Sequence, residues 1–359
     1  MVGKFAGLVS TDLRKTRGIA FDIATSGYFE ASITKTGKMV GKLTYGGLVY
    51  PVRGDVTASG AFLGEIPRKN NTPLALRLQL DTDVLGSKTL SGVVSADGRD
   101  SGIYCPKVLT KTEAATATAG IAGKYTLQMP MSDLITQAKP QGTGVATMTL
   151  ETSGRLKWVG TLPDGTPASQ TAYLSKDKTW PLFVNLYKGR GVILGTILHD
   201  AQVLDSDLSG FVNWGKIGDQ RDKLFPGGFI IPRTAVIGSL YTPPVSGQRV
   251  LSAFSFGNGT LFLEEGNFRA PFPVKSVGIT DRNKFVIAPA GSDKLELSVS
   301  VATGALKGSF IHPVTLRKTK VTGVVFQKTG RAYGQFTGST PTNTALQTGR
   351  LLLTPPSSN

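Results

Sequence analysis

The sequence predicts an all-β protein of tandem antiparallel β-meander units, and three observations lead to this prediction. The 359 residues include 44 glycines and 20 prolines, a composition typical of turn-rich β structure. Short segments such as KMVGKLTY (38–45) alternate apolar and polar residues with period two, as half-buried strands do. Short landmarks also recur in one order along the chain, which indicates an internal repeat.

The repeated landmarks divide the chain into units. They are Gly3-Lys4-Phe5 with Gly123-Lys124-Tyr125, Gly37 with Gly154, Pro73 with Pro181, and Leu90-Ser91-Gly92 with Leu208-Ser209-Gly210. Four matches in order predict that residues 1–118 and 119–245 are two copies of one β-meander unit. A third glycine hairpin, Gly304 and Gly308, resembles Gly37 and Gly41 but lies 150 residues after Gly154. Residues 246–359 are therefore predicted to form a diverged or partial third unit.

Each unit is expected to hold seven to eight short strands, separated by Thr-Gly, Gly-Gly, Ser-Gly and Asp-Gly pairs that favour tight hairpins. Such a meander can close as a small up-and-down barrel or fold into a sandwich, and the pattern leaves both open. Asp164-Gly165 and Asn258-Gly259 are the predicted two-residue turns. Residues 112–123 and 242–248 are the predicted linkers. MSDLITQA, from Met131, is the one predicted helix.

Composition limits the classes of protein to consider. The 40 Lys+Arg against 24 Asp+Glu give a formal net charge of +16, which favours anionic partners such as nucleic acid, acidic glycans or lipid headgroups. No apolar run approaches the roughly 20 residues of a membrane-spanning helix. A single cysteine, Cys105, excludes an internal disulfide and a cysteine-based metal cluster, and we expect it to be a buried small apolar residue.

Five stretches of the second unit and the last third carry a family resemblance. They are residues 174–197, 225–229 (FPGGF), 238–244 (GSLYTPP), 308–315 (GSFIHPVT) and 323–336. In these stretches the chain resembles uncharacterised β-rich repeat modules of large secreted or surface proteins of environmental bacteria. The resemblance implies an extracellular or cell-surface β module with no known activity. The N-terminus has no apolar signal core and reads as a strand, so a mature or excised domain is expected.

Residue patterns that carry catalytic or metal chemistry are missing from the sequence. There are only two histidines, His199 and His312, and we expect His312 to lie in a turn rather than to bind zinc. His199 and Asp200 are adjacent and face opposite sides of a strand, which does not build a Ser-His-Asp triad. The acidic group within residues 200–222 is expected to be a solvated loop rather than a calcium site. We predict a non-catalytic protein without a metal or cofactor.

The last third of the chain carries the candidate binding residues. It has 13 basic and 5 acidic side chains, and no acidic residue follows Glu296. The basic residues that we assign to a ligand-binding surface are Lys307, Arg317, Lys318, Lys320, Lys328 and Arg331. Lys318 and Lys320 are two residues apart and share one strand face. Trp180 and Trp214 are added as candidate aromatic platforms for a carbohydrate, with core packing as the alternative reading of each Trp.

These observations support one functional hypothesis and leave alternatives open. We expect a structural or adhesive extracellular module that binds an anionic polysaccharide or another cell-surface component through the basic C-terminal surface. A nucleic-acid-binding protein is one alternative, and it needs aromatic side chains for base stacking, for which Phe326, Tyr333 and Phe336 are available. An outer-membrane β-barrel is another alternative, because its strands also alternate over about ten residues. The sequence leaves the oligomeric state open.

Overall fold

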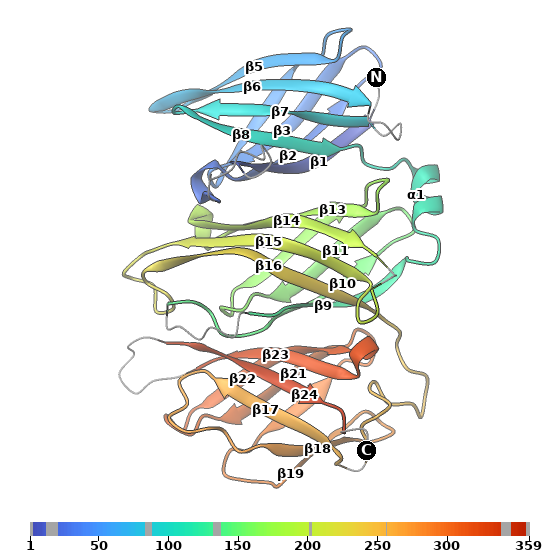
Figure 1. The fold of residues 1–359 in the computed structure, drawn as a ribbon, viewed down its shortest axis with the longest axis vertical. Coiled ribbons are helices and arrows are strands. Elements are labelled where there is room, and N and C mark those ends of the chain that lie inside the picture. Colours follow the sequence, from blue (N-terminus) through green and yellow to red (C-terminus); the bar gives the residue numbers. More distant parts are fainter. Residues whose placement is uncertain are drawn as a thin grey trace.

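The computed structural model describes residues 3–11, 21–82, 88–131, 138–200, 203–255, 257–338 and 346–356. Strands dominate these residues, accompanied by the α-helix α1 (Lys111–Ala117) and the short 3-10 helices η2 (Ile23–Thr25), η3 (Tyr187–Gly189) and η4 (Gln327–Thr329). The strands form three eight-stranded antiparallel sheets that are stacked along the long axis of the molecule (Figure 1). The predicted fold class, an all-β protein of tandem antiparallel meander units, is confirmed.

Each sheet takes eight strands that are consecutive in the chain. The first contains β1 (Gly3–Ser10), β2 (Gly27–Ile33), β3 (Lys38–Tyr45), β4 (Leu48–Asp55), β5 (Ala61–Arg68), β6 (Asn71–Thr82), β7 (Lys88–Ala96) and β8 (Arg99–Pro106). The second contains β9 (Gly123–Met129), β10 (Gly144–Leu150), β11 (Arg155–Thr161), β12 (Pro167–Tyr173), β13 (Thr179–Leu186), β14 (Gly191–His199), β15 (Leu208–Ile217) and β16 (Gly228–Tyr241). The third contains β17 (Gly259–Glu265), β18 (Lys275–Ile279), β19 (Phe285–Ala288), β20 (Glu296–Val299), β21 (Ala305–Ile311), β22 (Lys318–Phe326), β23 (Arg331–Thr337) and β24 (Thr348–Thr354).

The order of the strands shows how each sheet curls. Consecutive strands pair with each other, and the first strand of each sheet also pairs with the last: β1 with β8, β9 with β16, and β17 with β24. Each ladder therefore runs around a barrel and is interrupted at one seam, between β4 and β5, between β12 and β13, or between β19 and β20. Pairing of first and last strands selects a nearly closed barrel from the two arrangements that the sequence left open.

The strand order also tests the landmarks from which the repeat was inferred. Gly3 and Gly123 both open the first strand of a sheet, and Leu90 and Leu208 both lie in the seventh. Pro73, however, lies in the sixth strand of its sheet, whereas Pro181 lies in the fifth. These two positions are therefore not equivalent. Their sequences match because similar apolar residues suit any buried strand.

The third glycine hairpin is likewise in a different place from the first two. Gly37 and Gly154 follow the second strand of their sheets, whereas Gly304 follows β20, the fourth strand of the third sheet. All three glycines have positive φ values, 83°, 74° and 72°, so the shared pattern reports a common turn geometry rather than a common position. The third sheet is not partial in strand number, since it has eight strands like the others.

Local structure departs from the predictions at two connections. The first predicted linker contains α1, whose N-cap Thr110 accepts a hydrogen bond from the backbone N–H of Glu113, while the Glu113 carboxylate accepts one from the Thr110 N–H. Asp164-Gly165 is the predicted hairpin turn, but Asn258-Gly259 is not, because Gly259 opens β17 and the positive φ belongs to Gly257. The helix predicted from Met131 lies largely outside the described residues.

Each barrel interior is filled by apolar side chains that alternate with outward residues along the strands. The first interior includes Cys105, which is fully buried as predicted. The second contains all three tryptophans, Trp158, Trp180 and Trp214. The third is rich in phenylalanine, with Phe268, Phe310 and Phe336 in mutual ring contact. Close-packed interiors of this kind account for the stability of the barrels and leave functional chemistry to their outer faces.

A side chain bridges the seam of the second barrel. The Gln170 amide on β12 donates from Nε2 to the Pro181 carbonyl of β13 at 3.0 Å, and its Oε1 accepts from the Phe183 N–H at 3.1 Å. Oε1 also accepts from Trp158 Nε1 at 3.3 Å. One amide side chain thus supplies the donor and acceptor that a neighbouring strand would otherwise provide.

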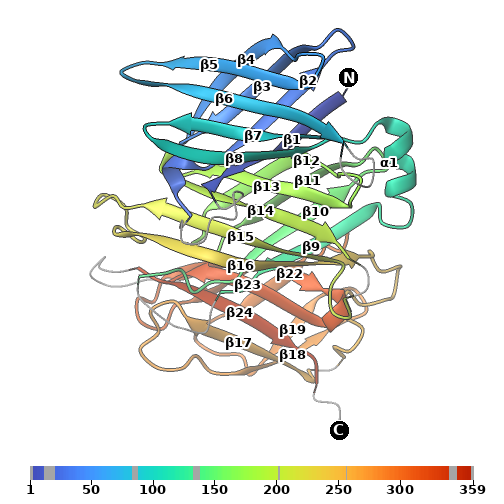
Figure 2. The same ribbon diagram turned by 45° about the horizontal axis from the view of Figure 1, so that its top comes forward.

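The three barrels are joined by direct contacts. Between the first and second, Leu8, Phe21 and Ile23 pack with Val192 and Leu194 in one buried cluster. The helix α1 lies at the side of the stack between these two barrels (Figures 1 and 2).

Several hydrogen bonds join the second and third barrels. Lys124 Nζ donates to the Ala302 carbonyl at 2.8 Å, and the Tyr241 hydroxyl donates to the Val301 carbonyl at 2.6 Å. Gln327 exchanges two hydrogen bonds with the Thr242 backbone, at 2.8 and 2.9 Å. The hydrogen bonds to Val301 and Ala302 therefore hold the turn before β21 against the second barrel.

Candidate functional site

The predicted basic surface does not form one cluster in the structure. Lys307 lies on β21, and Lys318 and Lys320 lie near the start of β22, all three with exposed side chains. Arg331 pairs with Phe326 at the other end of β22, about 26 Å away at the usual rise of a strand. The prediction treated these residues as one surface because they are close in sequence, but an antiparallel hairpin separates them.

Lys307, Lys318 and Lys320 line a shallow hollow of about 620 Å³ on the outer face of β20, β21 and β22. We call it the lysine hollow. Its other polar lining residues are Glu296, Ser298, Ser309 and Thr322. The hollow therefore combines three ammonium groups and three hydroxyls with a single carboxylate.

Strand register sets the spacing of the charges in the lysine hollow. Lys307 is directly opposite Thr322, so Lys320 is its diagonal neighbour on β22, about 7–8 Å away. Lys318 follows on the same face about 6.6 Å from Lys320, since two residues of a strand span that distance. The three lysines thus form one series, which runs diagonally from Lys307 on β21 to Lys320 on β22 and then along β22 to Lys318.

The carboxylate of Glu296 partly neutralises the hollow. Its Oε1 accepts a hydrogen bond from Ser309 Oγ at 2.6 Å and forms an ion pair with Lys318 Nζ at 3.0 Å. The hydrogen bond from Ser309, followed by the contact with Lys318, lowers the pKa of Glu296, so this residue is charged at neutral pH. Among the described residues no ion pair involves Lys307 or Lys320, which leaves both ammonium groups available to a ligand.

Three of the basic residues that follow Glu296 form ion pairs with carboxylates, although no acidic residue follows Glu296 in the sequence. Besides Lys318, Lys328 pairs with Asp207 at 2.9 Å and Arg350 pairs with Glu264 at 2.6 Å. A run without acidic residues in the sequence is therefore not a run without acidic neighbours in space. Arg317 precedes Lys318 and has an exposed side chain, but it is not among the residues that line the lysine hollow.

The tryptophans lie inside the second barrel. Trp180 and Trp214 are 1% and 0% exposed, and Trp158 is 4% exposed. None of the three presents a ring face to a surface ligand, so each tryptophan is a core residue. The prediction that Trp180 and Trp214 bind a carbohydrate was wrong, because the alternation of residues along one strand does not show which face of that strand the rest of the protein covers.

Two of the three aromatic residues considered for base stacking are covered, and the third, Tyr333, is half-buried. Phe326 and Phe336 are 0% and 1% exposed, and Tyr333 makes an edge contact with Phe326. Phe336 belongs to the core of the third barrel. Neither phenylalanine therefore offers a ring face for stacking, and Tyr333 is opposite Val324, about 13 Å along β22 from Lys320.

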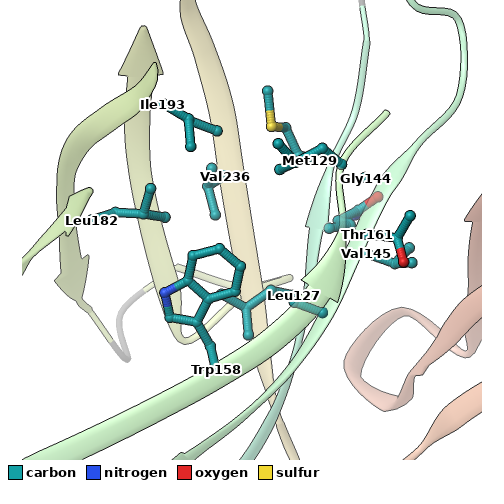
Figure 3. A pocket seen from close by; sticks show the side chains of 12 residues that line it. Leu127, Met129, Gly144, Val145, Trp158, Thr161, Leu182, Ile193 and Val236 are labelled. Carbon is teal, nitrogen blue, oxygen red and sulfur yellow. The ribbon is translucent and has the colours of Figure 1, made fainter. Parts of the chain in front are cut away.

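A cavity inside the second barrel is too small for a ligand. It measures about 40 Å³ and is lined by apolar side chains that include Met129, Trp158 and Ile193 (Figure 3). This volume is close to that of one water molecule. The cavity is a small gap beside Trp158, and Gln128 and Thr161 are the polar residues among those that line it.

Both histidines are buried, and His312 has a structural role. His312 is fully buried in the turn between β21 and β22, as its predicted turn position implies. Its Nε2 lies 2.9 Å from the Gly266 carbonyl, which can only accept, and its Nδ1 accepts from the Val314 N–H at 3.3 Å. The ring is therefore neutral with its proton on Nε2, and burial lowers its pKa. In the described part of the chain no group of three or more His, Cys, Asp or Glu side chains could hold a metal ion.

Part of the acidic group within residues 200–222 is ion-paired rather than simply solvated. Asp219 accepts from Arg190 and Arg221 at 2.7 Å each, and the hydrogen bonds from Arg221 hold its pKa well below its usual range. Asp222 pairs at 3.1 Å with Lys216, whose buried Nζ also donates to the Leu224 carbonyl. These carboxylates thus belong to ion-pair networks.

The fold and the lysine hollow together define a class: an all-β protein of three stacked, barrel-like units with a cationic outer face. No protein-family model matches the chain, and no curated protein matches it. One similar solved structure is the crystal structure of a mutant of the vaccine antigen transferrin-binding protein B from Haemophilus parasuis. It is 10% identical, with 98% of this chain and 76% of that chain covered and a TM-score of 0.20. A likeness at this level carries no argument about function, so the function is argued from the site itself.

Proposed function

We propose that this chain is a non-catalytic extracellular or cell-surface module that binds an acidic polysaccharide at the lysine hollow. The observation that carries the proposal is the cluster of Lys307, Lys318 and Lys320 on one sheet face with the accessible hydroxyls of Ser298 and Thr322. Ammonium groups pair with carboxylate or sulfate groups of the polymer, and hydroxyls bind its sugar oxygens.

An acidic polysaccharide suits this face better than a nucleic acid does. Proteins that bind single strands combine basic grooves with aromatic rings on which bases stack. Of the three aromatic candidates, Phe326 and Phe336 are buried, and Tyr333 is half-buried and about 13 Å along β22 from Lys320. A sugar polymer needs no stacking ring when charged groups and hydroxyls supply the contacts.

The location is supported by the resemblance of five stretches to modules of secreted and surface proteins. In the described part of the chain, no helix has both the length and the apolar character that crossing a membrane requires.

A heparin column and a glycan array test the proposal on the full chain. The test variant replaces the three lysines of the hollow with glutamine. The control replaces three exposed lysines of the first barrel, Lys38, Lys42 and Lys69, and so lowers the net charge equally. We expect the test variant to lose at least about tenfold in affinity for the acidic polymer, because each charge-assisted hydrogen bond contributes about 1.5–3 kcal/mol. The control should lose little.

Two results would overturn the proposal. Equal losses in the test and control variants would show that net charge alone drives binding. Tighter binding of single-stranded DNA than of an acidic polysaccharide with equal charge would assign the face to nucleic acid. Purification without detergent is part of the same experiment, since a protein that needs detergent to stay in solution contradicts a secreted module.

A further inference from the structure

A second cationic hollow lies on the outer face of the second barrel, and sequence reasoning did not single it out. It measures about 330 Å³ and is lined by residues of β9, β10 and β11 together with Thr303 of the third barrel. We call it the junction hollow. Lys124, Thr149 and Lys157 lie in one row across its three strands, because Lys124 pairs with Thr149 and Thr149 with Lys157.

The charge of the junction hollow is positive. Glu151 also lines it, but its carboxylate pairs with Arg155 at 2.7 Å. Lys124 uses one donor on the Ala302 carbonyl and retains two others, since an ammonium group has three. Lys157 is exposed, and no ion pair involves it among the described residues. Two ammonium groups thus remain for an anion.

The hairpin of β20 and β21 connects this hollow to the lysine hollow. Thr303, in its turn, lines the junction hollow, whereas Ser298 and Lys307 on its outer face line the lysine hollow. Lys307 follows Thr303 by four residues, so the two lie at most about 14 Å apart along the chain. β22 also packs on β9 and β10, so the outer faces of the two barrels turn toward each other at this junction.

The relative position of the two hollows is held by the turn itself. The Val301 carbonyl accepts from the Tyr241 hydroxyl, and the Ala302 carbonyl accepts from Lys124 Nζ. Gly304 ends the turn with a φ of 72°, and a Cβ there would lie 2.7 Å from the Tyr241 ring. The spacing between the hollows is therefore preorganised, which lowers the entropic cost of binding a ligand that reaches both.

We propose that the junction hollow and the lysine hollow form one track for a single extended acidic polysaccharide chain. The track runs from Lys157 past the Gly304 turn to Lys318, and its length is about 30 Å from the strand spacings and rises involved. This inference rests on the proposed function and adds the form of the ligand, an extended polymer rather than a compact anion. A compact anion could touch only one hollow.

Binding of heparin-derived oligosaccharides of graded length, from tetrasaccharide to dodecasaccharide, tests the track. The variant is Lys157→Glu on the full chain, with Lys38→Glu in the first barrel as the matched control. Both side chains are exposed on strands, and equal melting temperatures would verify folding. A longer oligosaccharide can bind a single hollow in more positions along its length, so its affinity rises even without a second hollow. The readout is therefore how much the rise of affinity with oligosaccharide length differs between the wild type and the variant.

We expect the wild-type affinity to rise at least about tenfold from tetrasaccharide to dodecasaccharide, and Lys157→Glu to remove most of this rise. The variant should bind the tetrasaccharide within about twofold of the wild type, because the lysine hollow is unchanged. An unchanged rise in Lys157→Glu would overturn the track and leave the proposed function intact. Absence of binding at every length in the wild type would overturn both.

Discussion

Lys328 of the third barrel and Asp207 of the second form an ion pair across their junction, with 2.9 Å between Nζ and Oδ1. Lys328 Nζ also donates to the Ser206 carbonyl at 3.0 Å, and the Asp207 carboxylate accepts from the Leu240 N–H at 2.7 Å. The Asp207 side chain is 12% exposed. A residue predicted to bind a ligand is thus part of the contact that joins two barrels.

Lys328→Met should destabilise the protein by about 1–2 kcal/mol, because it leaves a largely buried carboxylate without its cation. The free energy of unfolding in urea measures the loss. Lys318→Ala is the matched control, since its ion pair with Glu296 is exposed on both sides and should contribute less than about 1 kcal/mol. Similar losses in the two variants would contradict the structural role of Lys328.

Gln170→Ala should destabilise the second barrel by about 1–3 kcal/mol. The substitution leaves the Phe183 N–H, the Pro181 carbonyl and Trp158 Nε1 without the amide that satisfies them. Tryptophan fluorescence during urea unfolding reports on this barrel, which contains all three tryptophans. Thr171→Ala, an exposed neighbour on the same strand, is the control and should change stability by less than about 0.5 kcal/mol. A loss no larger than the control's would show that the seam does not need the bridge.

Gly304→Ala should cost more stability than Gly330→Ala. Both glycines have left-handed φ values, 72° and 63°, so the backbone strain of an alanine should destabilise the fold by about 1–2 kcal/mol at either position. A Cβ at Gly304 would also collide with the Tyr241 ring, whereas the space around Gly330 is open. The difference between the two variants in urea unfolding isolates the close approach of the turn to the second barrel. No difference would mean that the Tyr241 ring moves aside freely.

Stability should fall as the pH drops below about 6.5, the ordinary pKa of histidine. Burial lowers the pKa of His312 in the folded state, so the unfolded chain binds a proton more readily at acidic pH. The destabilisation by His312 is absent well above pH 6.5, and it grows as the pH falls from there toward the folded-state pKa of His312. His312→Phe should reduce the loss of unfolding free energy between pH 7.5 and 5.5. An unchanged loss would assign the pH dependence to other groups, His199 among them, because burial lowers its pKa too.

Much of the fold could be predicted because its signals are local. Period-two alternation identified strands such as β3, and Asp164-Gly165 identified a hairpin turn, since each depends on a few neighbouring residues. The seven to eight strands expected in a unit agree with the eight observed. Landmark matching failed at Pro181 and Gly304, because similar short sequences suit more than one position in a meander.

The candidate site was only partly predictable. The sequence singled out Lys307, Lys318 and Lys320, and two of them were placed on one strand face by their spacing alone. It did not indicate that Glu296 neutralises Lys318 or that Lys124 and Lys157 lie near the same hairpin. These relationships join residues of different strands or different barrels, which share no pattern along the chain.

By itself, the sequence determined an all-β chain of repeated meanders with a strongly basic last third, because composition, alternation and turn residues act over short distances. Only the tertiary structure decided which faces remain exposed. Pairing of first and last strands closed the barrels and enclosed Trp180 and Trp214. Stacking of the barrels placed Lys328 against Asp207 and left Lys307 and Lys320 in an open hollow. Exposure depends on what lies opposite a residue in space, and that follows from long-range packing.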